Sequence, residues 1–183
     1  MKRLPVILTL ISVFSFRIHA YTICLDPGHG GSDSGAVGTY YLEKNANLDV
    51  ANALWDSLWY NLIEVTEIRM TRTSDVDRSL EDRVAIANGT YWSPPQDPVD
   101  RFISIHHNAH DGTVQGTETY CHPDASSYAF DLRNKVQSRL VEAFQYPDRG
   151  TKTADFYVLR KTTMPAILGE AFQGMEQLDP GQP

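Results

Sequence analysis

Short apolar segments with strand character alternate with amphipathic helical segments along most of the chain. The strand-like segments are residues 22–26, 64–72, 101–105, 116–121, 155–159 and 165–168. Helical periodicity covers residues 43–60, a segment from the capping box at residues 79–82 to Asn88-Gly89, and a long segment that Asp124 or Ser126 can cap and that ends near Phe144. Such alternation is typical of α/β domains. We therefore expect a single α/β domain, a mixed and mostly parallel sheet of about six strands with helices on both faces.

The first 20 residues have the composition of a signal peptide. Lys2 and Arg3 precede an apolar run at residues 4–16, and Ile18-His19-Ala20 forms a plausible cleavage site. The alternative, an uncleaved membrane anchor, is disfavoured because the run is shorter than the roughly 20 residues that span a bilayer. We expect residues 1–20 to direct export to the periplasm or the extracellular space, and residues 21–183 to form the domain.

The charge of the chain limits its partners. Loss of residues 1–20 removes three of the 16 basic residues and no acidic residue, so the net charge falls from −7 to −10. Such a surface should not attract nucleic acid or adhere by charge to an anionic polymer. An anionic substrate would have to be held locally by a few arginine side chains.

The two cysteines do not form a metal site. Cys24 and Cys121 lack CxxC spacing, which excludes a cysteine zinc site. Both lie on expected strands, and in an exported protein they could form a disulfide or stay as buried free thiols. The sequence leaves this choice open.

Four side chains suited to metal chemistry lie at the ends of expected elements. His29 follows the first strand, His106 and Glu170 follow two later strands, and Glu43 opens the first helix. Each alone has an ordinary explanation, such as a glutamate that interacts with the helix dipole. Ligands of α/β sheets bind at strand ends, however, and three ligands plus a free carboxylate are what a hydrolytic zinc site needs. Together they predict such a site.

Neighbouring residues have several possible roles. Asp26 could orient the turn before His29 or accept the second imidazole proton of that histidine. His107 would face away from the metal if the strand continued past His106. His122 is either a solvated loop residue or a substrate contact.

A series of motifs resembles the zinc-dependent N-acetylmuramoyl-L-alanine amidases of the Amidase_3 type. The match runs in order over nearly the whole expected domain, through Asp26-Pro-Gly-His-Gly-Gly31, Gly35-Ala36, Glu43-Lys-Asn45, Thr71-Arg72, Ser79-Leu-Glu-Asp-Arg83, Ala87-Asn88, Ser104-Ile-His-His-Asn-Ala109, Gly116-Thr-Glu-Thr-Tyr120, Arg149-Gly150, Val158-Leu-Arg160 and Met164-Pro-Ala-Ile-Leu-Gly-Glu170. The resemblance implies a mixed sheet flanked by helices, and peptidoglycan as the substrate.

The resemblance also assigns roles to individual residues. It implies that His29, Glu43 and His106 bind one zinc ion and that Glu170 is catalytic, cleaving the amide between N-acetylmuramic acid and L-alanine. Arg149 and Arg160 could hold a stem-peptide carboxylate, or they could form ordinary ion pairs. We expect a monomer at the cell wall, and the sequence identifies no activating protein.

Two departures from the family pattern concern the end of the chain. Gly169 precedes the last glutamate and Ala171-Phe172-Gln173 follow it, so the local groove could differ. The final helix expected after that strand is either absent, or the chain is a fragment.

Two alternative functions stay open. One is a zinc peptidase that cuts within the peptidoglycan stem, and the other is a catalytically silent wall-binding or regulatory module of the same fold. A glycosidase would use two carboxylates and neither histidine. A serine hydrolase is disfavoured because no Gly-x-Ser-x-Gly elbow is present.

Overall fold

The computed structural model describes residues 20–38, 41–62, 64–107 and 116–170. The expected signal peptide lies outside the described residues except for Ala20, and residues 171–183, where a final helix was in question, lie outside them as well. Within the described ranges, no helix combines the length and apolar character needed to cross a membrane.

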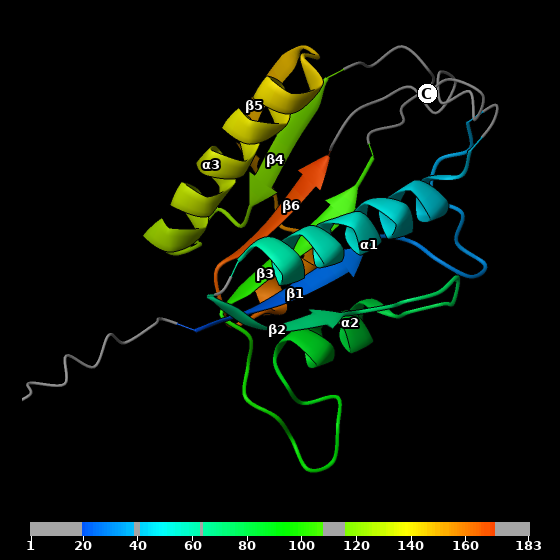
Figure 1. Ribbon diagram of the computed structural model, residues 1–183, viewed down its shortest axis with the longest axis vertical. Coiled ribbons are helices and arrows are strands. Elements are labelled where there is room, and N and C mark those ends of the chain that lie inside the picture. Colours follow the sequence, from blue (N-terminus) through cyan, green and yellow to red (C-terminus); the bar gives the residue numbers. More distant parts are fainter. Residues whose placement is uncertain (1–19, 39–40, 63, 108–115, 171–183) are drawn as a thin grey trace, which may run out of the picture.

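The described residues form one α/β unit around a six-stranded sheet of order β2-β1-β3-β6-β4-β5 (Figure 1). Strands β2, β1, β3 and β6 are parallel, β4 is antiparallel to β6, and β5 is parallel to β4. This confirms the predicted mixed and mostly parallel sheet. The elements in chain order are β1 (Tyr21–Pro27), α1 (Glu43–Asn61), β2 (Val65–Met70), α2 (Leu80–Ala87), β3 (Arg101–His106), β4 (Thr117–Cys121), α3 (Ser127–Phe144), β5 (Asp148–Thr153), α4 (Tyr157–Lys161) and β6 (Ala166–Glu170).

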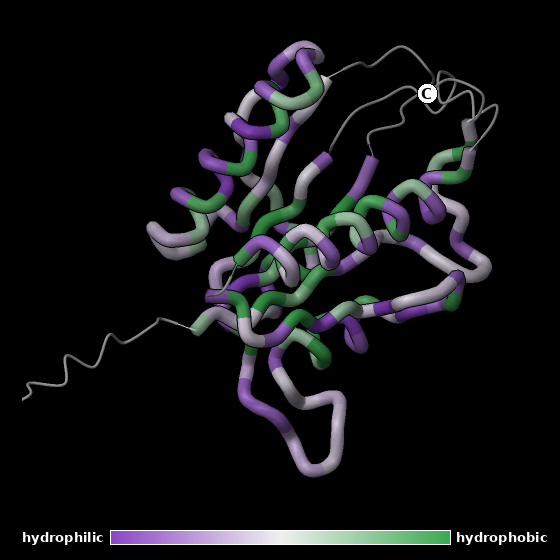
Figure 2. Tube along the Cα trace, in the orientation of Figure 1, coloured by the Kyte–Doolittle hydropathy of each residue, from purple (hydrophilic) through white to green (hydrophobic). Residues whose placement is uncertain are grey.

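The helices cover both faces of the sheet, as predicted. Helices α2 and α4 pack on one face around Phe102 and Leu168, while α3 packs on the other face around Ile167. Neighbouring residues of a strand point to opposite faces, which is why Ile167 and Leu168 belong to different clusters. Helix α1 packs against β1, β2 and β3 (Figure 1). Figure 2 shows apolar residues gathered along the central strands and polar residues along the outer side of α3.

One predicted strand is wrong. Residues 155–159 do not form a strand, because α4 begins at Tyr157, and the strand in this part of the chain is β5. Val158 and Leu159 are both buried in the same cluster, which a helix allows and a strand does not. Strand β5 has the sequence Asp-Arg-Gly-Thr-Lys-Thr and lies at the edge of the sheet, so it lacks the apolar alternation that marks a half-buried strand.

Two serine side chains fix helix starts, as the sequence suggested. The Ser79 hydroxyl accepts a hydrogen bond from the Asp82 backbone N–H at the start of α2. Ser126, rather than Asp124, caps α3 and accepts from the Ala129 N–H. These bonds satisfy backbone donors that have no partner within the helix.

The two cysteines are free thiols and do not pair. Cys24 belongs to the cluster under α2 and α4, whereas Cys121 belongs to the cluster under α3, so the sheet separates them. Burial raises the pKa of both thiols. They contribute to the packing of the two faces and take no part in a disulfide.

Candidate metal centre

Three of the four expected residues converge beyond the carboxyl ends of β1 and β3. His29 lies in the loop after β1, Glu43 is the first residue of α1, and His106 is the last residue of β3. Each offers one ligand atom, and these atoms lie within 4.8 Å of one another. The Glu43 carboxylate is 3.1 Å from Nε2 of His29 and 3.0 Å from Nδ1 of His106. The group can hold a metal ion.

Glycines let the loop and the ligands approach each other. A Cβ at Gly28 would lie 2.3 Å from the His106 ring, and one at Gly35 would lie 2.6 Å from both Glu43 and His29. His29 itself has a positive φ of 60°, which is uncommon for a residue with a side chain. The glycine-rich sequence is therefore needed for the spacing of His29, Glu43 and His106.

Glu43 is held as a buried carboxylate. Its oxygens accept hydrogen bonds from the backbone N–H groups of Ala36 at 3.0 Å and His107 at 3.2 Å. Burial alone would raise the pKa of Glu43, but hydrogen bonds from His106, His29 and Ala36 lower it below its ordinary value. Its position in the first turn of α1 also favours the charged form.

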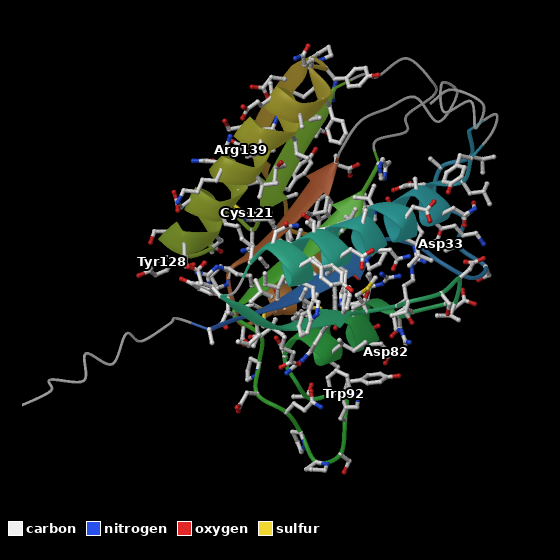
Figure 3. All side chains as sticks on the ribbon, in the orientation of Figure 1. Asp33, Asp82, Trp92, Cys121, Tyr128 and Arg139 are labelled. Carbon is white, nitrogen blue, oxygen red and sulfur yellow. The ribbon has the colours of Figure 1, made fainter. Side chains whose placement is uncertain are left out.

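Asp33, rather than Asp26, contacts the second nitrogen of His29. Its Oδ2 is 2.8 Å from Nδ1 of His29, which orients the imidazole so that Nε2 faces Glu43. The hydrogen bond to Glu43, together with that to Asp33, raises the pKa of His29 to about 9. Asp33 lies in the loop beyond the end of β1 (Figure 3). No sequence motif singled out Asp33, although an acid inside the glycine-rich loop was a usable signal.

Asp26 belongs to a buried hydrogen-bond network next to the turn. It is 1 % exposed and accepts hydrogen bonds from the Thr71 hydroxyl, the Ser104 hydroxyl and the Arg83 guanidinium. Burial alone would raise the pKa of Asp26, but the charge of Arg83 and these hydrogen bonds hold it below its ordinary value.

The His107 ring contacts the three-residue group indirectly, through Asn47. Strand β3 ends at His106, and the buried ring of His107 places Nδ1 2.6 Å from Oδ1 of Asn47. The Asn47 amide in turn donates to the Gly28 carbonyl and to Glu43. Burial lowers the pKa of His107 to about 4, so this ring is neutral at physiological pH. His107 does not belong to the three-residue group.

A cavity of about 710 Å³ opens at this edge of the sheet. Its lining includes His29, Glu43 and His106, and residues at the starts of α2 and α4. These last residues are Arg78, Ser79, Leu80, Phe156, Tyr157 and Val158.

Glu170 lines the same cavity, next to the three-residue group. It ends β6 and pairs in register with His106 on β3, and with Glu118 on β4. Burial raises the pKa of Glu170 above its ordinary value, and the nearby charge of Glu43 acts in the same direction. The structure therefore brings a second carboxylate, one that takes up a proton readily, close to the possible metal site.

Comparison with known proteins identifies the family. The family model named N-acetylmuramoyl-L-alanine amidase, Amidase_3, matches residues 23–174. The chain belongs to the Amidase_3 family.

Individual relatives agree with this membership. The sporulation-specific N-acetylmuramoyl-L-alanine amidase of Bacillus subtilis (strain 168) is 41% identical over 148 residues, which are 81% of this chain and 54% of the relative. Among solved structures, the N-acetylmuramoyl-L-alanine amidase from Clostridium difficile 630 has a TM-score of 0.75 at 35% identity, covering 84% of this chain and 80% of that one. The catalytic domain of CwlV from Bacillus (Paenibacillus) polymyxa var. colistinus has a TM-score of 0.70 at 32% identity, with coverages of 83% and 80%. This Amidase_3 chain thus spans about half the length of the Bacillus subtilis amidase.

The two candidate arginines lie outside the described lining of the cavity. Arg149 on β5 donates from Nε to Oε2 of Glu118 at 2.9 Å, and Glu118 is the strand neighbour of Glu170. Arg160 on α4 pairs with Asp155. It lines a second cavity of about 210 Å³ together with His122, which also lies near Asp155.

Proposed function

We propose that this Amidase_3 chain hydrolyses the amide bond between N-acetylmuramic acid and L-alanine in peptidoglycan. The observation that carries the proposal is the convergence of two imidazoles and one carboxylate beside a second carboxylate in one cavity. The family and the names of the relatives support the reaction and the substrate.

In this proposal His29, Glu43 and His106 are the ligands of one zinc ion. A tetrahedral zinc with bonds of about 2.0–2.2 Å holds its ligand atoms roughly 3.4 Å apart. Here Oε2 of Glu43 lies 3.1 Å from His29 and Oε1 lies 3.0 Å from His106, and the ligand atoms of all three residues lie within 4.8 Å of one another. Two nitrogens and one carboxylate oxygen are a donor set that catalytic zinc sites use, with a position left for water. A zinc ion bound there would lower the pKa of a water molecule and polarise the scissile carbonyl.

Glu170 moves the proton in the proposed reaction. Its carboxylate accepts a proton from the attacking water as the new carbon–oxygen bond forms. It then delivers that proton to the amine of L-alanine as the carbon–nitrogen bond breaks. Its position in the cavity lining and its raised pKa suit a group that must hold the proton between these two steps.

The remaining parts of the proposal concern the substrate and the location. Arg149 or Arg160 would hold a stem-peptide carboxylate, and the contact of Arg149 with Glu118, the strand neighbour of Glu170, makes Arg149 the nearer candidate by strand order. Residues 21–183 would act as a monomeric catalytic domain. Residues 1–20 would direct export to the periplasm, the extracellular space or the cell wall, where peptidoglycan lies.

End-group analysis of digested peptidoglycan tests the proposal. Incubation of purified wall with the protein should expose N-terminal L-alanine and create no new reducing ends. A chelator should abolish the release, and added zinc should restore it. New amino termini at another stem position would identify a zinc peptidase instead. No cleavage, combined with no zinc in the purified protein, would favour a silent wall-binding module.

A further inference from the structure

Two arginines hold the backbone of the loop that carries His29. Three consecutive carbonyls of this loop accept hydrogen bonds from guanidinium groups. Arg83 donates to Pro27 and to His29, each at 2.7 Å. Arg72 donates to Pro27 at 3.0 Å and to Gly28 at 2.8 Å. The backbone before and at the first proposed ligand is therefore fixed from two sides.

The arginines connect the loop to distant parts of the fold. Arg83 belongs to α2 and Arg72 follows β2, and both are buried, at 4 % and 2 % exposure. The charge of Arg83 is balanced by Asp26 at 2.7 Å, and Ser104 on β3 donates to the other oxygen of Asp26. One buried network thus joins the loop to β1, β3 and α2.

His29 needs such support because of its backbone conformation. Its φ of 60° lies in the left-handed region, which is unfavourable for a residue with a side chain and persists only where the surroundings enforce it. The direction of its imidazole depends on that conformation. A bond from Arg83 to the carbonyl of His29 itself acts directly on this backbone.

Lysine could not replace Arg83 in this role. Arg83 bonds Asp26, two loop carbonyls and the Arg78 carbonyl at once. This uses the fixed fork of a planar guanidinium, whereas a lysine ammonium is a compact point charge with three donors. Burying an arginine with its counter-ion also costs desolvation free energy, so packing alone does not explain a buried arginine at this position.

We propose that Arg83, assisted by Arg72, is a positioning residue that holds His29 in its ligand geometry before any metal binds. The inference rests on the proposed role of His29 as a zinc ligand. Neither arginine needs to touch substrate for this role.

Zinc affinity of the Arg83→Lys variant tests the inference. Arg69→Lys is the matched control, because Arg69 is also buried and also bonds a carboxylate and two carbonyls, those of Ile86 and Asp97, away from the His29 loop. Competition with a chromophoric chelator at fixed pH should show about tenfold weaker zinc binding for Arg83→Lys, at the low end of the losses caused by changes around metal ligands. Arg69→Lys should bind as the wild type does, even where its thermal stability falls equally. Equal affinity of Arg83→Lys and wild type would overturn the inference, as would an equal loss in both variants.

Hydrogen exchange of the zinc-free wild type provides a second test that needs no variant. The amide hydrogen of Gly30 bonds the Asp33 carbonyl within the loop, and that of Gly28 bonds the carbonyl of Ile105 on β3. If the arginines hold the loop in advance, these amides should be protected without zinc and change little when zinc is added. Rapid exchange that becomes slow only with zinc would show that the metal orders the loop, and would overturn the inference. Wild type that binds no zinc would instead refute the proposed function, and the exchange result on the zinc-free protein would still decide whether the loop is held before any metal binds.

Discussion

Replacing Gly28 with alanine should remove His106 from the proposed metal site while the domain stays folded. The new Cβ would lie 2.3, 2.4 and 2.7 Å from three atoms of the His106 ring, whereas ordinary contacts begin at 3.4 Å. The ring must therefore withdraw by about 1 Å, and metal–ligand distances tolerate only about 0.2 Å. Changes around a ligand typically cost 10–100-fold in metal affinity, so displacement of a ligand itself should weaken zinc binding at least about 100-fold.

The assay is zinc competition against a chromophoric chelator, with thermal unfolding measured on the same samples. Gly169→Ala is the matched control, because Gly169 directly precedes Glu170 but its added Cβ would meet only Leu140, at 3.9 Å. This control should bind zinc with the affinity of the wild type. A folded Gly28→Ala variant whose zinc affinity stays within about threefold of the wild type would refute the reasoning, because the tenfold lower limit for changes around a ligand would not be reached.

Three further changes probe the site and its support. Glu170→Gln should retain zinc and lose roughly 10²–10⁴-fold in kcat for wall digestion, and near-normal turnover would remove Glu170 from the mechanism. Asp33→Ala should weaken zinc binding about tenfold in the chelator assay by freeing the His29 ring, and unchanged affinity would exclude this orienting role. Asp26 has a lowered pKa in the folded protein, so its ionised form stabilises the fold above its unfolded pKa of about 3.9, and that contribution is lost as pH falls through the folded value. The difference in unfolding free energy between wild type and Asp26→Asn, measured with urea, should therefore be smaller at pH 2.5 than at pH 6, and a constant difference would contradict it.

The sequence predicted the elements that have strong apolar patterns and missed those that do not. Strands β1, β3 and β6 are buried and apolar, and their ends carried the expected site residues. Strand β5 is polar and lies at the sheet edge, so nothing in its pattern distinguished it from a loop. Val158-Leu159 looked like part of a strand because adjacent apolar residues do not separate a short helix from a buried strand.

The site residues lie close together because of the strand order, which the pattern of the sequence does not reveal. Strands β1, β3 and β6 are neighbours and parallel, so their carboxyl ends reach the same edge of the sheet. His106 and Glu170 occupy paired register positions there. The apolar pattern of the sequence predicted that His106 and Glu170 each follow a strand. Only the topology of the sheet makes the ends of those strands adjacent.

The supporting residues were harder to predict than the proposed ligands. Asp33 acts from a loop, where no periodicity indicates direction, and among the acids near His29 only Asp26 was assigned a possible contact with that imidazole from the sequence. Arg83 lies on the buried side of α2, and a buried charged residue indicates that a counter-ion lies nearby. The sequence alone does not identify that counter-ion, which is Asp26. The separation of Cys24 from Cys121 likewise follows from the alternation of the two strands, which fixes the face of the sheet that each thiol occupies.

Anomalous diffraction at the zinc edge, from crystals of the full chain grown with one equivalent of zinc, tests the central claim most directly. The account predicts a single strong peak about 2.0–2.2 Å from ligand atoms of His29, Glu43 and His106, with Glu170 close by but not bound. A peak held by other residues, or no peak at these three side chains in a folded and zinc-saturated crystal, would contradict it.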